Sequence, residues 1–544
     1  MSHSRQFDRM IQIARLARYC AQRGISTEQG LEQLQAMREQ RRAEISRRGF
    51  LGGMAAAAGA GVFLRSRAVR AGQQPSPSAN VAIVGAGLAG LVCADTLREA
   101  GIAATLYEGR DRVGGRQWSM GGSFAGPVSF PGQVVERGGE LIDNLHKVLL
   151  GYAQEFGLAK EDLAKKWLPG ETKWFFDGQH VSDAQVVDEF RDLVDRMRDD
   201  LTQVSGEVTA GSFTEFDRQL DLTSLREYLQ TRGAGPIITK AVDVSYNIEY
   251  GGEIDQQSAL NFLFFIHADK RARFTPFGVY SDERWHIIGG NEQIAQRIHA
   301  RLPGVTHLGA RLLRARKTSG GRVELVFDEG GQTRSYTHDA VVFAVPFSTL
   351  RLVELDANLE LPPWKRQAIN ELRYGNNAKQ MIGFNSRFWG AHGSDSVTYS
   401  DLANHQNTWE ANPTNASANR AVLVDFAGGN RGAAMDPGQR GREATAFLAD
   451  LERVLPGAQA AAVRSGNQYL SHIEHWPSDP LSRGSYTCNQ PGYFTSICGN
   501  EATPIENLYF AGEHTDLFYS WQGFMEGAAL SGIRAADEII ADFA

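Results

Sequence analysis

Apolar and polar positions alternate most informatively between residues 81 and 108. An apolar run at residues 81–84 leads into a glycine-rich turn, a segment with helical spacing follows at residues 91–100, and a second apolar run at residues 103–107 ends on Glu108. Short apolar runs bounded by turn residues are typical of buried parallel strands. The pattern therefore predicts a strand, a helix and a second strand in succession.

Three glycines of the turn follow the spacing Gly85, Gly87 and Gly90. In a strand–helix turn of this kind the first glycine permits a tight bend, the second lets backbone N–H groups approach a pyrophosphate, and the third lets the helix pack closely on the strand. The start of the helix adds partial positive charge toward such an anion. These features predict a dinucleotide-binding unit.

Glu108 lies at the spacing of an acid that accepts hydrogen bonds from a ribose diol, where a 2′-phosphate would be repelled. Arg112 and Arg116 follow it on either side of a Gly-Gly turn, and two guanidinium groups suit an extended diphosphate. A glycine turn without a ligand is the alternative. It is disfavoured because the strand, the helix and the acid are all in place.

The rest of the chain shows less specific patterns. Residues 183–203 carry apolar positions three and four apart beside a charged face, which predicts an amphipathic helix with a structural role. Apolar runs at residues 380–384 and 421–426 and a helix-like stretch at 441–455 are consistent with a second sheet covered by helices.

The N-terminal region carries an export pattern. Arg47 and Arg48 stand in a Ser-Arg-Arg-Gly-Phe-Leu sequence before an apolar, uncharged run at residues 49–64, which resembles a twin-arginine signal. The run is short for a membrane span and only mildly apolar, so we expect an exported, periplasmic or secreted protein without a stable membrane span. The predicted boundaries are a signal region at residues 1–71, with a small-residue cleavage site at 69–71, and a Pro/Ser-rich linker at 72–79.

The segment before the twin arginines is long for a signal sequence. Met37 as the true start would give residues 37–48 as a conventional basic region, and a functional extension at residues 1–36 is the alternative. We favour the shorter form.

Composition and charge narrow the choice of partner. The chain of 544 residues predicts two domains, and 42% hydrophobic and 22% charged residues are ordinary for a folded protein. Residues 1–70 hold 13 Arg, no Lys and 5 acidic residues, so they carry +8 and the remainder about −15 of the total of −7. This balance argues against a nucleic-acid partner and mildly favours cationic small molecules, although a solvated acidic surface is the commoner explanation of such a charge.

Cysteine and histidine add little chemistry. Cys488 and Cys498 would pair in an oxidising compartment only if the fold brought them close, and the sequence leaves this open. No Cys-x-x-Cys pair or histidine cluster is present, and His472 and His475 are weak ligand candidates, so no metal site is predicted.

From residue 80 onward the chain resembles the FAD-dependent amine oxidase family, which includes monoamine oxidases, polyamine oxidases and L-amino acid oxidases. The motifs that carry the resemblance are Arg112-Val-Gly-Gly-Arg116, Glu136-Arg-Gly138-Gly139-Glu140, residues 288–293 and 341–346, Lys379, and residues 476–480, 483–486, 510–515 and 521–528. The resemblance implies an α/β fold. A Rossmann-like FAD-binding domain would be assembled from residues 80–143, 286–345 and 481–544, and a mixed α+β substrate domain from residues 144–285 and 346–480.

The resemblance also implies catalytic and substrate-binding positions. Lys379 matches the lysine that holds a water near flavin N5, where O2 reoxidises the cofactor; a lysine at a strand end that reaches solvent is the alternative. Tyr486 and Phe524 resemble the aromatic walls that flank the substrate nitrogen, and each by itself is also consistent with core packing. Trp476 and Trp521 would line the substrate pocket, although Trp476 is equally consistent with joining the two domains.

The cofactor implied is FAD. Ser485 stands where some relatives carry a flavin-linking cysteine, so the FAD is expected to be non-covalent. The residues expected to contact it are Gly85, Gly87, Leu88, Ala89, Gly90, Glu108, Gly109, Arg110, Arg116, Gly138, Gly139, Glu140, Leu312, Gly512, Glu513, Phe524 and Met525.

Comparison of residues 138–143 with the motifs of the family bears on the class of substrate. Leu141 occupies the place of the arginine that pairs with the substrate carboxylate in L-amino acid oxidases of the family. Asp143 falls where some polyamine oxidases place an acid for a distal ammonium group, but a helix N-cap before residues 145–156 is at least as good an interpretation. Three other arginines could bind a carboxylate from another direction: Arg273, Arg284 and Arg387.

The sequence therefore predicts an FAD-dependent amine oxidase. It would oxidise a primary or secondary amine, including polyamines, by hydride transfer to flavin N5, with O2 reduced to H2O2. An L-amino acid oxidase that yields a 2-oxo acid, ammonia and H2O2 is one alternative, and a non-catalytic flavin-binding protein is another. The expected partners are the amine, O2 and the twin-arginine export machinery, and the oligomeric state is left open.

Overall fold

The computed structural model describes residues 26, 27, 29, 79–163, 170–267, 283–413, 420–516 and 521–543. The twin-arginine motif, the expected cleavage site and Met37 lie outside these described residues, as does Arg273.

The predicted strand–helix–strand unit forms the centre of a parallel sheet. β1 pairs in parallel with β2 and β13, and Val81 lies opposite Ala104 and Ala340, so all three strands end at the same edge. The five strands have the order β22-β13-β1-β2-β9. Their bounds are Val81–Val84 (β1), Ala104–Glu108 (β2), Thr306–Leu308 (β9), Ala340–Phe343 (β13) and Leu508–Phe510 (β22). Neighbouring strands that are distant in sequence confirm the expected Rossmann-like arrangement.

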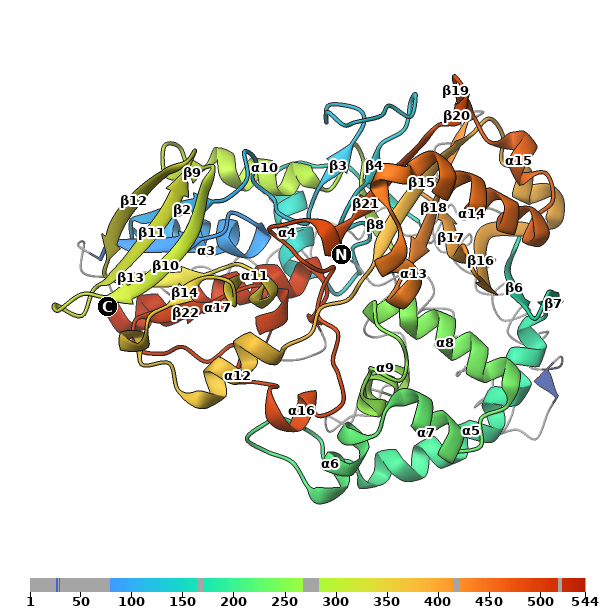
Figure 1. Ribbon diagram of the computed structural model, residues 1–544, viewed down its shortest axis with the longest axis horizontal. Helices are drawn as coiled ribbons and strands as arrows, with labels where there is room; N and C mark the ends of the chain where they lie inside the picture. The colour runs from blue at the N-terminus through green and yellow to red at the C-terminus, as the bar shows by residue number, and fades with distance from the viewer. Residues whose placement is uncertain are drawn as a thin grey trace, which may run out of the picture.

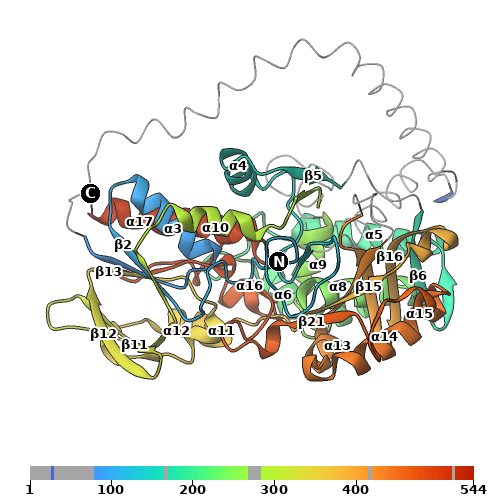
Figure 2. The same ribbon diagram turned by 90° about the horizontal axis from the view of Figure 1, so that it is seen from above.

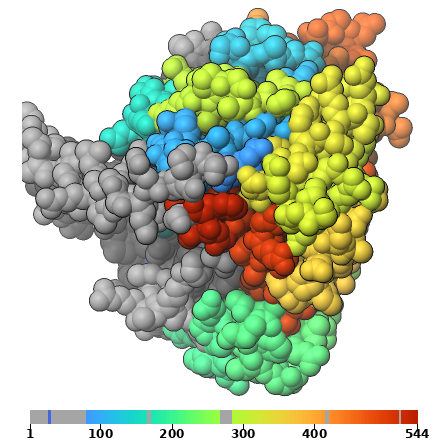
Figure 3. Space-filling model, turned by 90° about the vertical axis from the view of Figure 1, so that its left-hand side faces the viewer, coloured from blue at the N-terminus to red at the C-terminus, as the bar shows by residue number. Residues whose placement is uncertain are grey.

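Helices cover one face of this sheet and a smaller sheet covers the other (Figure 2). The helices are α3 (Leu88–Glu99), α10 (Glu292–Ala300) and α17 (Met525–Phe543). α17 lies tightly on α3, because a Cβ added to Gly532 would be 2.3 Å from the carbonyl oxygen of Ala89. Figure 3 shows these two helices, blue and red, side by side on one face of the molecule.

The smaller sheet has the order β12-β11-β10-β14. Its strands are β10 (Ala310–Lys317), β11 (Val323–Glu329), β12 (Gln332–His338) and β14 (Glu354–Leu355). Tyr107 of β2 stacks on Phe327 of β11 with ring centroids 4.3 Å apart, which joins the two sheets. The sequence motifs placed the end of this FAD-binding segment at residue 345. β14 pairs in parallel with β10, so the chain still belongs to the smaller sheet at residues 354–355.

A seven-stranded mixed sheet forms the other half of the molecule (Figure 1). Its order is β21-β15-β18-β17-β16-β6-β7, with bounds Ser471–His475, Ala378–Phe384, Ala421–Ala427, His405–Glu410, Ser394–Leu402, Glu171–Phe176 and Gln179–Val181. Helix α14 (Arg440–Val454) covers one face and α8 (Pro236–Tyr250) the other (Figure 2). The predicted apolar runs at residues 380–384 and 421–426 are the central strands β15 and β18.

Helices of the first insert pack beside this sheet (Figure 1). They are α5 (Asp183–Gln203), α6 (Glu215–Leu222), α7 (Leu225–Thr231), α8 and α9 (Ala259–His267). The helix predicted from apolar spacing is confirmed as α5, which begins with a capping box between Ser182 and Gln185 and buries its apolar side chains. None of the helices in the described ranges is both long and apolar enough to span a bilayer.

Candidate functional site

An elongated cavity lies at the carboxyl ends of β1 and β2. The empty space in it amounts to about 1390 Å³ when the open solvent at its mouth is included. Thirteen of the expected contact residues line it: Gly85, Gly87, Leu88, Ala89, Glu108, Gly109, Arg110, Arg116, Leu312, Gly512, Glu513, Phe524 and Met525. The other four, Gly90, Gly138, Gly139 and Glu140, are not part of this lining.

The turn after β1 shapes one end of the cavity. Gly85 has a φ of +105°, and a Cβ there would lie 2.6 Å from the carbonyl oxygen of Ala344. A Cβ on Gly90 would lie 1.9 Å from the carbonyl oxygen of Gly85, so Gly90 acts through helix–strand packing. A Cβ on Gly87 would meet only the Cα of Gly115, at 4.0 Å. The protein itself thus leaves room at Gly87, on the side that faces the cavity.

The start of α3 faces this space. No side chain caps the helix at Gly87, so its first N–H groups are available to an anion. Glu108 stands opposite: its Oε2 accepts from the N–H of Ala86 at 2.8 Å and its Oε1 from the N–H of Arg110 at 2.9 Å. A carboxylate has further lone pairs, so Glu108 can still accept a pair of hydroxyl groups.

An ion pair between Arg116 and Glu513 forms part of the cavity lining. Arg116 Nη1 donates to Glu513 Oε1 at 3.0 Å and to the carbonyl oxygen of Ser485. Glu513 Oε2 also accepts from Thr487 Oγ1 at 2.9 Å and from the N–H of Gly523 at 2.7 Å. Burial acts to raise the pKa of Glu513, but Arg116 and these hydrogen bonds outweigh it and lower the pKa below its ordinary value. The carboxylate is therefore ionised.

Several cavity residues were not predicted. Val345 and Pro346 follow β13, Leu481 and Ser482 lie near Gly109, and His514 follows Glu513. Val345 and Pro346 belong to a motif that was recognised without being assigned a role. Leu481 carried no signal of its own, because its place beside Gly109 depends on a contact between distant segments.

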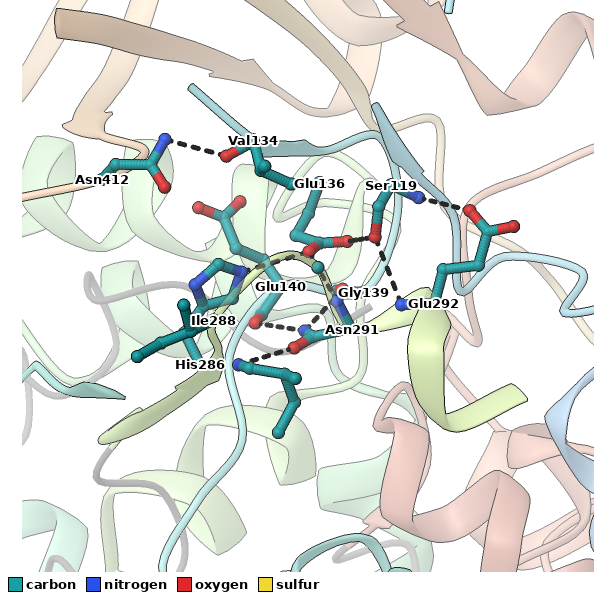
Figure 4. Close-up of polar contacts among 12 residues, drawn as sticks. Ser119, Val134, Glu136, Gly139, Glu140, His286, Ile288, Asn291, Glu292 and Asn412 are labelled. Carbon is teal, nitrogen blue, oxygen red and sulfur yellow. Dashed lines mark hydrogen bonds and ion pairs between the residues drawn. The ribbon is translucent and has the colours of Figure 1, made fainter. Parts of the chain in front are cut away.

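Residues 136–140 lie beyond the cavity and are held by polar groups from two other segments, at Ser119 and at residues 286–291 (Figure 4). Asn291 donates from Nδ2 to the carbonyl oxygens of Gly139 and Glu140, at 3.1 and 2.6 Å. Glu136 accepts from His286 Nε2 at 3.1 Å and from the N–H of Asn291 at 2.8 Å. Gly139 in turn lies against the cavity residue Met525, since a Cβ there would be 2.6 Å from the methionine sulfur.

His286 carries a positive charge beneath this loop. Its Nδ1 donates to Glu161 at 2.8 Å while Nε2 donates to Glu136. Burial disfavours the charged ring, but the hydrogen bonds and charges of both glutamates outweigh it and raise the pKa of His286 to about 10. The imidazolium therefore links two segments across the neutral pH range.

Lys379 extends from β15 to the same loop. Its Nζ donates to Glu140 Oε2 at 2.7 Å and to the carbonyl oxygens of Gly138 and Glu136 at 2.8 and 3.3 Å. The side chain is only 3% exposed. The alternative in which the amine reaches solvent is therefore wrong.

The predicted aromatic residues fall into two buried groups. Tyr486 packs with Trp476, and its hydroxyl donates to the carbonyl oxygen of Ile248 at 3.1 Å. Trp476 lies over Gly138, where a Cβ would come within 3.2 Å of the indole. The loop that binds Lys379 therefore also contacts the Trp476–Tyr486 pair.

The second aromatic group stands at the cavity wall. Phe524 packs edge-on against Trp521 at 5.7 Å and against His146 at 5.2 Å, and His146 meets Trp521 at 5.1 Å. Burial lowers the pKa of His146 to about 3, so its ring is neutral.

Asp143 adjoins this group and is not a helix cap. Helix α4 (Lys147–Glu155) has His146 as its N-cap residue, so the N-cap interpretation of Asp143 is wrong. Asp143 Oδ1 instead accepts from the N–H of Glu283 at 2.7 Å, and Oδ2 lies 3.4 Å from His146 Nε2. Asp143 is 1% exposed, and His146 lies between it and the cavity residue Phe524.

The structure shows where the two cysteines and the two histidines named as candidates lie. Cys488 and Cys498 are separate buried thiols, so a bond between them is not formed. His472 pairs with Glu474, and His475 bonds Ser478 and a backbone carbonyl. Within the described ranges no group of three or more His, Cys, Asp or Glu side chains is arranged to hold a metal ion.

Comparison with known proteins decides the family. The sequence profile of the flavin containing amine oxidoreductases matches residues 88–540. The chain belongs to this family.

Individual relatives are distant but cover most of the chain. A putative L-amino-acid oxidase, YobN, of Bacillus subtilis is 25% identical over 85% of this chain and 94% of its own length. Polyamine oxidase 4 of Oryza sativa subsp. japonica is 27% identical over 84% and 88%. A putrescine oxidase solved with bound putrescine has a TM-score of 0.68 at 22% identity, covering 85% of this chain and 99% of that one.

This amine oxidase uses FAD, and the cavity fits it. The space at Gly87, the uncapped start of α3 and the acceptor Glu108 suit a diphosphate and a ribose, as they would for a dinucleotide. When bound, the flavin takes a hydride equivalent from the amine and passes the electrons to O2. The protein supplies position and electrostatics.

Proposed function

We propose that this FAD-dependent oxidase takes an amine without an essential α-carboxylate, a primary or secondary amine or a polyamine. The products would be an aldehyde, ammonia or a smaller amine, and H2O2. The observation that carries the proposal is the lack of a carboxylate clamp: Leu141, buried at 4% exposure, occupies the place of the clamping arginine.

Two of the three arginines named as possible substitutes, Arg284 and Arg387, are engaged within the chain, and the third, Arg273, lies outside the described residues. Arg284 donates to both oxygens of Asp162, at 3.0 and 2.8 Å. Arg387 donates to both oxygens of Glu410, to Oε1 from Nη2 at 2.7 Å and to Oε2 from Nε at 3.1 Å. A bidentate carboxylate partner already uses the fork of each guanidinium, which supports a substrate without a carboxylate.

Buried acidic groups near the aromatic residues favour a cation. Asp143 lies beside the Phe524 group, and Glu283 is 1% exposed. Burial together with nearby charges, Glu283 among them, raises the pKa of Tyr486 well above its ordinary value. A substrate ammonium group distal to the reacting carbon would be stabilised by these carboxylates.

The roles that we propose for the aromatic residues and for Lys379 follow from their burial. Tyr486 and Phe524 would flank the amine nitrogen, with Trp476 and Trp521 behind them, and would keep water from the reacting carbon. Lys379 would stand at the flavin on the opposite side and act when O2 takes the electrons.

An L-amino acid oxidase remains the second candidate. It is favoured by the relatives named as L-amino-acid oxidases, one of which, from Notechis scutatus scutatus, is 24% identical over 85% of this chain. The Leu141 substitution and the engaged arginines favour the first candidate.

The deciding experiment is anaerobic mixing of the purified enzyme with a panel of monoamines, diamines, polyamines and L-amino acids. We expect amines to bleach the oxidised-flavin absorbance and to give H2O2 on admission of air. The matching amino acids should be at least about 100-fold slower in kcat/KM, because Arg284 and Arg387 are already paired with carboxylates of the protein. Bleaching by amino acids alone would overturn the proposal in favour of the second candidate.

We also propose that the FAD is non-covalent and that the enzyme is exported through the twin-arginine route. Ser485 offers a hydroxyl rather than a thiol, and it donates to Asn377 Oδ1 inside the protein. Export of folded cargo suits a protein that must take up its flavin before crossing a membrane.

A further inference from the structure

We propose that Glu140 is a positioning residue that holds the Lys379 side chain in place for the reaction of the reduced enzyme with O2. The inference rests on the proposed place of Lys379 at the flavin. Sequence motifs assigned Glu140 to the cofactor, but its carboxylate points to the lysine instead.

The lysine is held by three acceptors from one short loop. An ammonium group has three N–H donors, and those of Lys379 meet Glu140 Oε2, the carbonyl oxygen of Gly138 and, at 3.3 Å, that of Glu136. Glu140 is 5% exposed. Two buried opposite charges in this geometry fix the side chain in one position.

The carboxylate itself is also fixed. Glu140 Oε1 accepts from Trp409 Nε1 at 2.8 Å, and the backbone of Glu140 is held by Asn291 (Figure 4). Trp409 is on β17, so the seven-stranded sheet supplies both the lysine and the group that orients its partner.

Other charges near Lys379 are already paired. Glu474 lies opposite Lys379 in the β15–β21 ladder, but it accepts from Arg137 and His472. Within the described residues, Glu140 is the carboxylate that contacts Nζ. Without it, the ammonium group would lose its carboxylate partner. It would then no longer be held where it can stabilise the negative charge that develops as O2 accepts electrons.

The test is a double-mutant cycle of Glu140→Gln and Lys379→Met. Each enzyme is reduced with dithionite under anaerobic conditions and mixed with O2 at pH 6 and pH 9, and reoxidation is followed by flavin absorbance. Because the reduction is chemical, the result does not depend on which amine is the substrate. We expect Glu140→Gln to slow reoxidation by about tenfold or more at both pH values, because the ammonium group is no longer fixed by a carboxylate.

The cycle separates positioning from general damage. Glu140→Gln should add nothing in the Lys379→Met background, because its effect passes through the lysine. Thermal unfolding gives a readout independent of turnover. Lys379→Met should lower Tm because Glu140 then stays buried without its cationic partner, and the double variant should recover part of the loss.

Trp409→Phe and Asp425→Asn complete the set. Trp409→Phe removes one hydrogen-bond donor to Glu140 and should slow reoxidation by about two- to fivefold. This variant tests the proposal if Glu140→Gln does not fold. Asp425→Asn removes a buried carboxylate from the same sheet without touching Lys379 and should leave reoxidation unchanged.

Two results would overturn the proposal. One is a Glu140→Gln rate equal to wild type at both pH values; the other is an equal loss at both that persists in the Lys379→Met background. If Lys379→Met itself reoxidises normally, the assigned place of the lysine at the flavin fails as well, and that outcome is distinct from failure of Glu140 alone.

Discussion

Gly85 and Gly87 flank Ala86 in one turn but are glycines for different physical reasons. Gly85 has a positive φ and no space for a Cβ against Ala344, whereas Gly87 has an ordinary φ of −69° and free space toward the cavity. The first requirement comes from the protein and the second from its cofactor. Alanine substitutions therefore distinguish folding from flavin binding.

We expect Gly85→Ala to lower the free energy of unfolding by about 1–3 kcal/mol. Gly87→Ala should change the stability of the flavin-free protein by less than about 1 kcal/mol while weakening FAD binding at least about tenfold. Thermal unfolding of flavin-free protein and fluorescence titration with FAD measure both. Equal losses of stability in the two variants would contradict this assignment.

Ser485 bears on how the flavin is held. It is fully buried and bonded to Asn377, and the nearby Cys488 is a separate buried thiol with a pKa raised by burial to about 12. We therefore expect acid precipitation to release all FAD into the supernatant. A pellet that stays yellow would show a covalent link.

At the scale of elements, the centre of the seven-stranded sheet buries charge on both faces. Lys379 of β15 is paired on one face. On the other, Asp425 of β18 is 1% exposed, and neither of its carboxylate oxygens has a hydrogen-bond donor among the described residues. Burial raises the pKa of Asp425 to about 8, although Arg431 acts to lower it.

This pKa shift has a definite sign for stability. A group whose pKa is raised on folding stabilises the protein below its unfolded pKa, near 3.9 for aspartate, and loses that contribution as pH rises through the folded value. Asp425→Asn should therefore raise the free energy of unfolding by about 1–3 kcal/mol more at pH 8 than at pH 5. Urea unfolding at both values tests this, and a difference independent of pH would contradict it.

At the scale of the whole molecule, the catalytic parts come from segments far apart in the chain. The five-stranded sheet takes strands from residues 81–108, 306–343 and 508–510, and the other sheet from residues 171–181 and 378–475. The enzyme must therefore complete its fold before the flavin site exists. Such a protein suits a route that exports folded cargo.

Export is tested with the two arginines of the signal. Arg47→Lys with Arg48→Lys should leave the precursor in the cytoplasm, whereas the same change at Arg41 and Arg42 should not affect export. Cell fractionation with activity staining measures the outcome. Normal export of the Arg47/Arg48 variant would contradict a twin-arginine route.

The sequence by itself determined the cofactor turn, the family and most of the cavity lining. Spacing between Gly85 and Glu108 specifies a strand, a helix start and an acid, because these requirements are local. The helix at residues 183–203 was equally predictable from its period.

Only the tertiary structure decided how distant charges pair. It joined Lys379 to Glu140, placed Leu481 beside Gly109, and engaged Arg284 and Arg387 with carboxylates. It also showed that Asp143 is not a helix cap but a buried acid beside His146 and Phe524. These charge pairs join residues that are 23, 122 and 239 positions apart in the chain, and local spacing carries no information about such contacts.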